Sequence, residues 1–308
     1  MRIISLLASG TEMVCALGQG EALVGRSHEC DNPDWVHRLP ACTRPAFDVS
    51  RSSAEIDAEV RRRLKSGEPL YHVDADVINE LEPDVLITQV HCDVCAVTPN
   101  DVARAGGVPQ TTRVVALNAS SVADIYDDVR RVANVLGREA VANDVIREMQ
   151  RRIQGVTASV AHRPAPSVVV LEWTDPVFTA SNWAPELIAA AGGTSLVSRS
   201  GEHSVAIPWE QVVNANPQYV IVAPCGFDLE RSLREVAVLE RLPRWFELSA
   251  VQNGRVAFAD GNKYFNRSGI TIVETVEILA EILHPGCMRP RWHERAWHAY
   301  MPKKIADC

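Results

Sequence analysis

The stretch from Val122 to Ile153, VADIYDDVRRVANVLGREAVANDVIREMQRRI, decides how this chain is organised. Its apolar residues recur every three or four positions, and the stripe continues after Gly137. This spacing places them on one face of an α-helix, with acidic residues near its start and arginines near its end, as the helix dipole prefers. About 35 residues of helix would span roughly 50 Å, which is long for a globular domain. We therefore expect a spine helix over residues 120–162 that joins two lobes.

Strand and helix patterns alternate on both sides of this stretch. Five apolar runs have the length and composition of buried strands: Val85–Thr88, Val114–Leu117, Val168–Leu171, Tyr219–Ala223 and Val256–Phe258. Strands that alternate with amphipathic helices are typical of parallel sheets covered on both faces. We predict an α/β protein with two Rossmann-like lobes, residues 1–119 and 163–286, each with a mainly parallel sheet. A C-terminal tail over residues 287–308 follows, and a ligand is expected in a cleft between the lobes.

Length and charge narrow the function classes. The chain has 308 residues and a formal net charge of −8. This length is enough for two domains, and the acidic balance argues against nucleic acid or an anionic membrane surface as a partner. The short basic and aromatic run Arg289–Tyr300 is expected to dock onto the body of the protein. A small molecule is the expected partner.

The first residues predict the compartment. Met1–Glu12 contains only a short apolar run, whereas an export signal needs roughly 7–15 apolar residues followed by a cleavage site. We therefore expect a cytoplasmic protein. The eight cysteines are then expected to be reduced thiols rather than a disulfide framework.

Several segments resemble a known family. They are Ser5–Glu12, Gly25–Asp31, Cys92–Val97, Pro208–Val212, Ala223–Phe227, Asp260–Arg267 and Ile278–Pro285. In this order they resemble the helical-backbone (class III) substrate-binding proteins, which carry cobalamin and ferric siderophores, and they are most similar to the cobalamin-binding branch. The resemblance covers roughly residues 1–286. It implies a ligand held between the carboxyl ends of the strands of both lobes, with Glu12 in the first strand-to-helix turn among the binding residues. Exported relatives deliver cargo to a membrane transporter, and for a cytoplasmic chain no transporter docking is expected.

Cysteines and histidines follow the strands of the first lobe. Cys30 follows one strand together with His28, and Cys92 and Cys95 follow another together with His91. Thiolate and imidazole are the ligands that zinc and other borderline metals prefer. We expect these residues to form a zinc or iron–sulfur site at the cleft edge. Redox chemistry of the thiols and simple packing are the alternatives.

Aromatic and charged residues occupy the corresponding places in the second lobe. Trp173 and Trp183 could form an apolar wall against a flat ligand, although Trp183 could equally fasten its helix to the sheet. The further candidates for ligand contacts are His203, Trp209, Tyr264, Phe265 and Arg267. Glu172, at a strand end, and Arg267 are also the candidates for catalysis, since a carboxylate at such a position is rarely buried without a partner.

Two functions compete at this point. The first is an intracellular binding protein for a corrinoid such as cobalamin or for another metal chelate. The alternative is a metal- or iron–sulfur-dependent enzyme that reuses the cleft with Cys30, Cys92 and Cys95. In the cobalamin carriers that the chain resembles, an aromatic residue commonly contacts the corrin from the loop where this chain has Cys92 and Cys95. The thiols at this position favour the alternative. No Walker loop or hydrolase motif names a reaction, so turnover of a substrate stays open.

Overall fold

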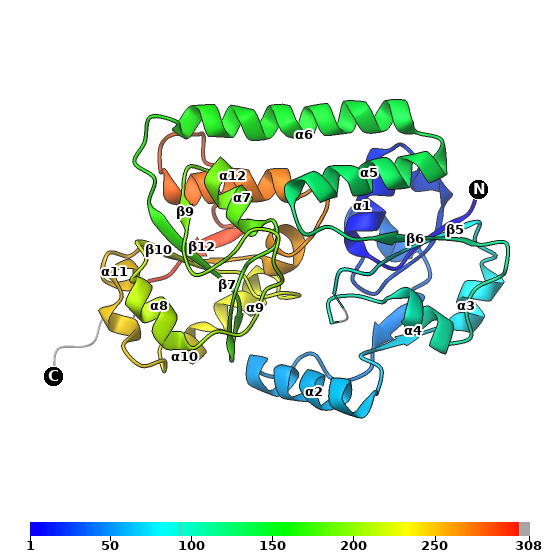
Figure 1. Cartoon of the computed structure of the whole chain (residues 1–308), viewed down its shortest axis with the longest axis horizontal. Coiled ribbons are helices and arrows are strands. Elements are labelled where there is room, and N and C mark those ends of the chain that lie inside the picture. The colour runs from blue at the N-terminus through cyan, green and yellow to red at the C-terminus, as the bar shows by residue number, and fades with distance from the viewer. Residues whose placement is uncertain (93, 302–308) are drawn as a thin grey trace. The chain divides into compact units, whose positions relative to one another are not determined.

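The computed structural model describes residues 1–92 and 94–301, and the chain divides into two compact units (Figure 1). The first unit comprises Met1–Gln150 together with Ser268–Ile270. The second comprises Arg151–Arg267 and the residues from Thr271 onward. Each unit contains its own sheet with parallel strands at its centre. The predicted α/β fold with two lobes is therefore confirmed.

The first unit is built on a four-stranded parallel sheet in the order β2-β1-β5-β6. Its strands are β1 (Ile3–Ser5), β2 (Leu23–Arg26), β5 (Val85–Gln89) and β6 (Arg113–Leu117), and its helices are α1 (Ala8–Ala16), α2 (Ser53–Ser66), α3 (Ala75–Glu80), α4 (Pro99–Arg104) and α5 (Val122–Leu136). Ile3 and Ile87 pack with residues of α1 and α5, whereas Ile4 and Leu86 pack with residues of α3 and α4. Neighbouring residues of a strand point to opposite faces, so both faces of this sheet are buried.

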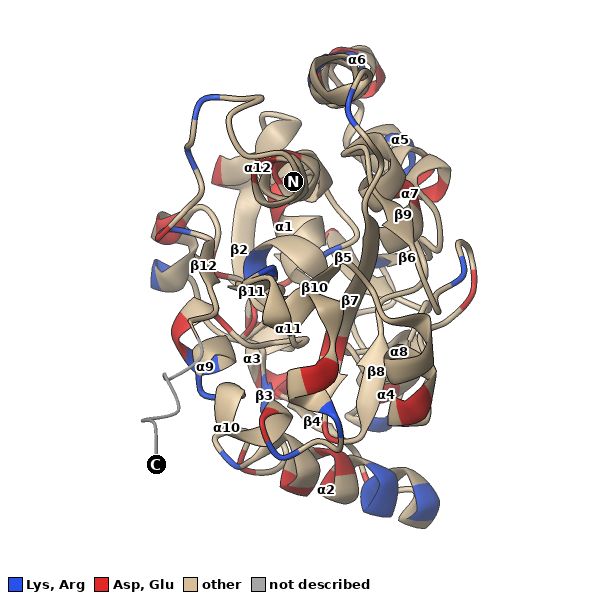
Figure 2. Cartoon of the chain, turned by 90° about the vertical axis from the view of Figure 1, so that its left-hand side faces the viewer, with Lys and Arg blue, Asp and Glu red and all other residues tan. Residues whose placement is uncertain are grey.

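Short elements complete the first unit. They are η1 (Gly20–Ala22), η2 (Asp34–Arg38) and the antiparallel pair β3 (Thr43–Pro45) and β4 (Tyr71–Val73). Helix α2 carries side chains of both charges, as Figure 2 shows, and Glu59 pairs with Arg62 and Arg63 along it. Such pairs three and four residues apart mark a solvated helix face.

The stretch expected to be one spine helix forms two helices. Helix α5 ends at Leu136, and α6 (Glu139–Val160) begins three residues later. Gly137 has a φ of 64°, a left-handed conformation that glycine adopts readily and that ends a helix. The spacing of the apolar residues is compatible with one long helix and with two shorter ones, so it does not indicate the break at Gly137. The chain passes from the first unit to the second within α6, at Gln150. No helix in residues 1–92 and 94–301 has the length and apolar character needed to cross a membrane.

The second unit is built on a sheet with the strand order β12-β11-β10-β7-β8, and β9 also pairs with β7. The strands are β7 (Ser167–Thr174), β8 (Val177–Thr179), β9 (Thr194–Ser195), β10 (Tyr219–Val222), β11 (Val256–Ala259) and β12 (Trp297–Ala299). The helices are α7 (Ala184–Ala190), α8 (Trp209–Ala215), α9 (Leu229–Leu233), α10 (Val236–Leu239), η3 (Trp245–Glu247), α11 (Ser249–Gln252), η4 (Gly261–Phe265) and α12 (Ile272–Leu283). Strands β9, β7, β10 and β11 are parallel, and β8 and β12 are antiparallel to their neighbours.

The basic and aromatic segment near the C-terminus docks onto the second unit, as expected. Strand β12 pairs with β11 at the edge of the sheet. The carboxylate of Glu281 on α12 accepts hydrogen bonds from the backbone N–H groups of Arg291, Trp292 and His293 and from the indole of Trp297, at 2.7–3.0 Å. The segment is therefore part of the folded unit.

Three residues from the second half of the chain belong to the first unit. Ile270 packs against the core around α1 and α5. At Gly269 a Cβ atom would lie 2.7 Å from the Cβ of Ser9, so the approach requires glycine. The first unit is therefore not one continuous segment of chain.

Candidate functional site

The carboxyl ends of the parallel strands in the first unit lead into loops held by short polar contacts. After β2, the Nδ1 atom of His28 lies 2.8 Å from the hydroxyl oxygen of Thr43, and its Nε2 atom lies 3.2 Å from a carboxylate oxygen of Glu29. The imidazole also lies 5.5 Å from the ring of Tyr71, measured between centroids. These contacts fix the orientation of the imidazole at the sheet edge.

The loop after β5 is held by a buried glutamine. The side-chain amide of Gln89 donates to the carbonyls of Cys92 and Ala96 at 2.6 and 2.7 Å, and its oxygen accepts from the N–H of Cys92 at 2.8 Å. The hydroxyl of Tyr71 donates to the carbonyl of Val94 at 2.6 Å. Cys92 and Cys95 are joined by a disulfide. The loop is thus held by the hydrogen bonds of Gln89 and cross-linked by the disulfide between Cys92 and Cys95. Asp93, within it, lies outside the described residues.

The structure does not assemble the metal site that the cysteines predicted. Cys92 and Cys95 bond to each other, so neither offers a thiolate to a metal. Cys30 is fully buried, where its sulfur accepts a hydrogen bond from the hydroxyl of Thr11 at 3.0 Å. Within residues 1–92 and 94–301, no group of three or more His, Cys, Asp or Glu side chains has the arrangement of a metal site. The prediction of a zinc or iron–sulfur centre is therefore not supported.

The two histidines of the predicted metal site and Glu12 have other surroundings. His28 contacts Thr43 and Glu29, as described above. The pKa of Asp124 is lowered by hydrogen bonds from Ser120 and Ser121, and the charge of His91 adds to this effect, which places His91 near the start of α5. Glu12 on α1 is buried, and its carboxylate accepts a hydrogen bond from the amide of Asn32 at 3.2 Å.

The edge of the sheet in the second unit carries a row of aromatic and charged side chains. The indole of Trp173, at the end of β7, lies 5.1 Å from the ring of Phe227, and the guanidinium of Arg231 lies 4.0 Å above that ring. Arg231 pairs with Glu235 at 2.5 Å, and the hydroxyl of Thr174 donates to the same carboxylate. Phe227 is buried, so the accessible aromatic surface here is that of the half-buried Trp173. An aromatic surface near a fixed cation suits a flat ligand that carries acidic groups.

Only Trp173 of this row is predicted from the sequence as a ligand contact. Phe227 belongs to a segment that supports the family resemblance, and Arg231 and Glu235 carry no motif of their own. Arg231 lies on α9, whereas Phe227 precedes this helix and Glu235 follows it. No helical periodicity therefore indicates these three residues as a group.

Glu172 has the most perturbed environment at this edge. Burial raises the pKa of Glu172 to about 7, although a hydrogen bond with Ser204 acts in the opposite direction. The hydroxyl oxygen of Ser204 itself accepts from the backbone N–H of Ser181 at 3.0 Å. Near neutral pH, Glu172 is therefore a carboxyl group that can exchange a proton or donate a hydrogen bond.

Other candidates of the second unit have roles within the fold. Trp209 belongs to the core, where its indole lies 6.0 Å from that of Trp245 and donates to the carbonyl of Pro243 at 2.7 Å. Trp183 is also buried, which favours the alternative that it fastens α7 to the sheet. Phe265 and Arg267 are buried, whereas His203 is exposed.

Tyr264 contacts the C-terminal segment. Its ring lies 5.4 Å from that of Trp292 in an edge-on arrangement. Burial raises the pKa of Tyr264 to about 12, with a further contribution from Asp260, while the charges of Arg295 and Arg267 partly oppose this shift. The contacts made by Tyr264 are thus those of a structural residue.

Two α/β units, with aromatic and charged side chains at the carboxyl edge of a parallel sheet, define the class of two-lobed α/β ligand-binding proteins. A family model described as "Periplasmic binding protein" matches residues 3–262. The chain therefore belongs to the periplasmic binding protein family, and the resemblance seen in the sequence is confirmed.

Individual relatives are distant. The chain is 23% identical over 297 residues to the uncharacterized ABC transporter substrate-binding lipoprotein YvrC of Bacillus subtilis (strain 168), covering 92% of this chain and 80% of that protein. The fold is similar to that of a periplasmic heme binding protein from Pseudomonas aeruginosa, with a TM-score of 0.68, 19% identity and coverage of 92% and 93%. It is also similar to that of the periplasmic vitamin B12 binding protein BtuF of Vibrio cholerae, with a TM-score of 0.62, 19% identity and coverage of 92% and 96%.

Proposed function

We propose that this protein binds a corrinoid or a related flat metal chelate, such as heme, with the residues at the carboxyl edges of its sheets. The observation that carries the proposal is the half-buried indole of Trp173, which packs beside the buried ring of Phe227 and near the guanidinium of Arg231. The indole offers a surface to a planar macrocycle, and the guanidinium offers N–H donors for an acidic or amide substituent on its rim. Membership of the periplasmic binding protein family supports ligand binding in general. Solved proteins of similar fold whose names include heme and vitamin B12 support the ligand class.

Glu172 adds a second element to the proposed binding surface. A carboxyl group with a pKa of about 7 can donate a hydrogen bond to a ligand when it is protonated and accept one when it is ionised. We therefore expect ligand affinity to change across neutral pH. The same property could serve general acid–base chemistry. We do not propose a metal- or cluster-dependent enzyme, because Cys30, Cys92 and Cys95 form no common metal site within residues 1–92 and 94–301.

Isothermal titration with cyanocobalamin and with hemin tests the proposal. We expect at least one of them to bind with micromolar affinity or tighter, on the order of −8 kcal/mol. Replacing Trp173 by alanine should weaken that binding about tenfold or more, because an aromatic residue that packs against a ligand contributes roughly 1.4 kcal/mol or more. Phe246→Ala is the matched control, since this exposed aromatic residue lies on η3 and outside the row. The proposal fails if neither compound gives a heat signal, or if both variants lose affinity equally.

The cytoplasmic location predicted from the sequence stays a prediction. Fractionation of cells that produce the native protein, with cytosolic and membrane markers, would check it. The companion expectation that no transporter docks conflicts with the curated relative, which is an ABC transporter substrate-binding lipoprotein. We therefore do not maintain that expectation.

A further inference from the structure

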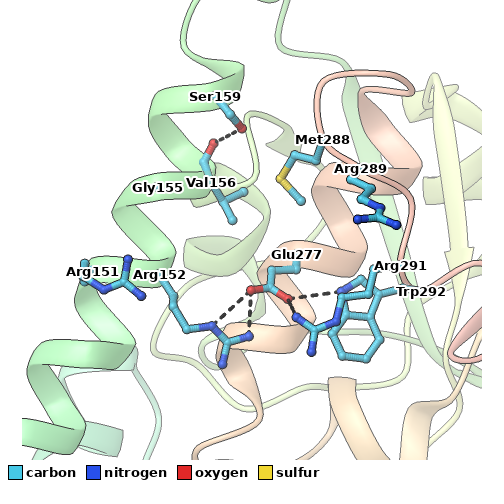
Figure 3. A pocket seen from close by; sticks show the side chains of 10 residues that line it. All are labelled: Arg151, Arg152, Gly155, Val156, Ser159, Glu277, Met288, Arg289, Arg291 and Trp292. Atoms are coloured by element: carbon cyan, nitrogen blue, oxygen red, sulfur yellow. Dashed lines mark hydrogen bonds and ion pairs between the residues drawn. The ribbon is translucent and has the colours of Figure 1, made fainter.

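A pocket of about 390 Å³ lies within the second unit, away from the row of Trp173, Phe227 and Arg231 (Figure 3). Its walls are the second half of α6, the helix α12 and the segment that follows residue 287. Four arginines line it, two on α6 and two on the C-terminal segment: Arg151, Arg152, Arg289 and Arg291. Pockets of this size take small ligands, and the proposed function does not use this one.

The carboxylates at the pocket lie beside two of its arginines. Glu277 is the carboxylate among the lining residues, and Glu274 lies beside it on α12. Arg152 pairs with both, at 2.7 Å to Glu274 and 2.7 Å to Glu277. The guanidinium of Arg291 lies 3.8 Å from the second oxygen of Glu277, an oxygen that also accepts from the indole of Trp292. These two carboxylates therefore interact with Arg152 and Arg291 and not with Arg289.

Arg289 provides the clearest excess charge. Its side chain is exposed, and within residues 1–92 and 94–301 it forms no ion pair or hydrogen bond. Figure 3 shows its guanidinium above Arg291 and Trp292 on the same side of the pocket. An arginine that projects beside a paired one leaves donors for a ligand anion at the pocket mouth.

The backbone at Arg291 is held in place. Glu281 accepts hydrogen bonds from the N–H groups of Arg291 and Trp292, and the Trp292 ring is buried against Tyr264. The opposite wall is α6. Gly155 on this helix leaves open space beside it, because a Cβ atom there would meet no atom within 4 Å. Guanidinium groups on a fixed frame lose less conformational entropy when they bind an anion than groups on a mobile loop.

We propose that this pocket binds the phosphoryl group of a small anion. The planar guanidinium presents paired N–H donors that match two oxygens of a phosphate, and a cluster of arginines is the usual protein partner of that group. Arg289 and Arg291 would contact the phosphoryl oxygens, whereas the charge of Arg152 is neutralised by Glu274 and Glu277 and this residue only forms part of the pocket wall. The chemistry is shared by a soluble phosphate ester and by a phospholipid headgroup, and the experiment separates these sources.

The test uses the full chain, with pyrophosphate as the soluble probe and phosphatidylglycerol vesicles as the lipid probe. We expect calorimetry to detect pyrophosphate binding that weakens with added salt, as an interaction between exposed charges must. Arg289→Glu should reduce the affinity at least tenfold. Arg199→Glu is the matched control, because Arg199 is an exposed arginine in the same unit and the variant changes the net charge by the same amount. It should bind within about twofold of the unchanged protein, since Arg199 is not among the residues that line the pocket and salt screens exposed charges.

The outcomes decide between the possibilities. Pyrophosphate binding that Arg289→Glu abolishes and Arg199→Glu spares supports a soluble ligand. Vesicle binding with the same sensitivity, and no response to pyrophosphate, supports a lipid headgroup. Binding of neither probe at millimolar concentration, or an equal loss in the two variants, overturns the proposal. Unchanged far-UV circular dichroism of Arg289→Glu would show that the variant folds, and Arg291→Ala gives an independent reading at the neighbouring guanidinium.

Discussion

Replacing Glu281 by glutamine tests whether the C-terminal segment is fastened to the second unit through one carboxylate. One oxygen of Glu281 accepts from the N–H of His293 at 2.7 Å and from the Trp297 indole at 3.0 Å. The other accepts from the N–H of Arg291 at 2.7 Å and of Trp292 at 3.0 Å. Glutamine keeps one acceptor oxygen and turns an N–H₂ group towards the remaining donors. Two buried N–H groups then lose their partner.

The size of the effect follows from these contacts. A hydrogen bond to a charged acceptor contributes about 1.5–3 kcal/mol, so the loss of two lowers the free energy of unfolding by roughly 3–6 kcal/mol. Glu230→Gln is the matched control, because the side chain of Glu230 is 82% exposed and pairs with Arg234 on the surface of α9. An exposed pair of this kind contributes about 0.3–0.5 kcal/mol.

Urea unfolding followed by tryptophan fluorescence measures both variants, and Trp292 and Trp297 lie at the affected contact. The dependence on pH gives a second readout. Burial raises the pKa of Glu281, but hydrogen bonds from the Arg291 and Trp292 backbone and from Trp297 outweigh it and bring the pKa below its usual value. The stabilisation is therefore present above the unfolded pKa of about 4.3 and is lost as the pH falls through the folded value. The difference between wild type and Glu281→Gln should be constant from neutral pH down to about 5 and shrink below about 4. A loss of less than about 1 kcal/mol at pH 7 would refute the reasoning, because one ordinary hydrogen bond would account for it.

Three further changes probe other parts of the chain. Glu172→Gln should raise stability by roughly 3 kcal/mol at pH 8 and leave it unchanged near pH 4. A carboxyl whose folded pKa is raised to about 7 destabilises the native state progressively as the pH rises from the unfolded pKa of about 4.3 towards 7. Urea unfolding at the two pH values measures it, and an equal effect at both would contradict it. Gly261→Ala should destabilise the protein by about 3 kcal/mol or more, because a Cβ atom at this position would lie 2.1 Å from the carbonyl oxygen of Pro224. Gly155→Ala on α6 should instead stabilise the protein by roughly 0.5–1 kcal/mol through helix propensity, because its Cβ atom would meet nothing within 4 Å. Thermal melts compare the two variants, and similar melting temperatures would count against the geometry. Cys92 and Cys95 should resist alkylation in the denatured protein until a reductant is added, because they form a disulfide. Peptide mass spectrometry checks this, and labelling without reductant would show that the thiols are free.

The strands and the family could be predicted because their patterns are local. Val85–Thr88 and Val168–Leu171 are apolar runs of strand length, and both lie within buried strands of the two sheets. The motif segments follow these strands, so their order along the chain identified the family. The docking of the C-terminal run also followed from composition, since aromatic residues in an acidic protein gain more from packing than from solvent.

The break after Leu136 and the role of the cysteines could not be predicted in this way. The apolar residues before and after Gly137 have the same helical spacing, so the stripe does not distinguish one long helix from two helices with a break at the glycine. Cys30 and Cys92 both follow strands, but which way a side chain turns in such a loop depends on its hydrogen bonds. Thr11 holds Cys30 in the interior, and Gln89 folds the loop that brings Cys92 to Cys95. Such contacts depend on the folded geometry of the loops, which the sequence pattern does not show.

The contribution of Ser268–Ile270 to the first unit has a consequence during synthesis. A ribosome completes residue 150 long before it reaches Ile270, although Ile270 packs against the core of the first unit. At about 5–20 residues per second, the interval between Gln150 and Ser268 lasts roughly 6–24 s. During that time the nascent first unit exposes the apolar surface that Ile270 later covers. The first unit therefore emerges first but is completed only when Ile270 has been made, and until then its uncovered apolar surface is open to a chaperone at the exit tunnel.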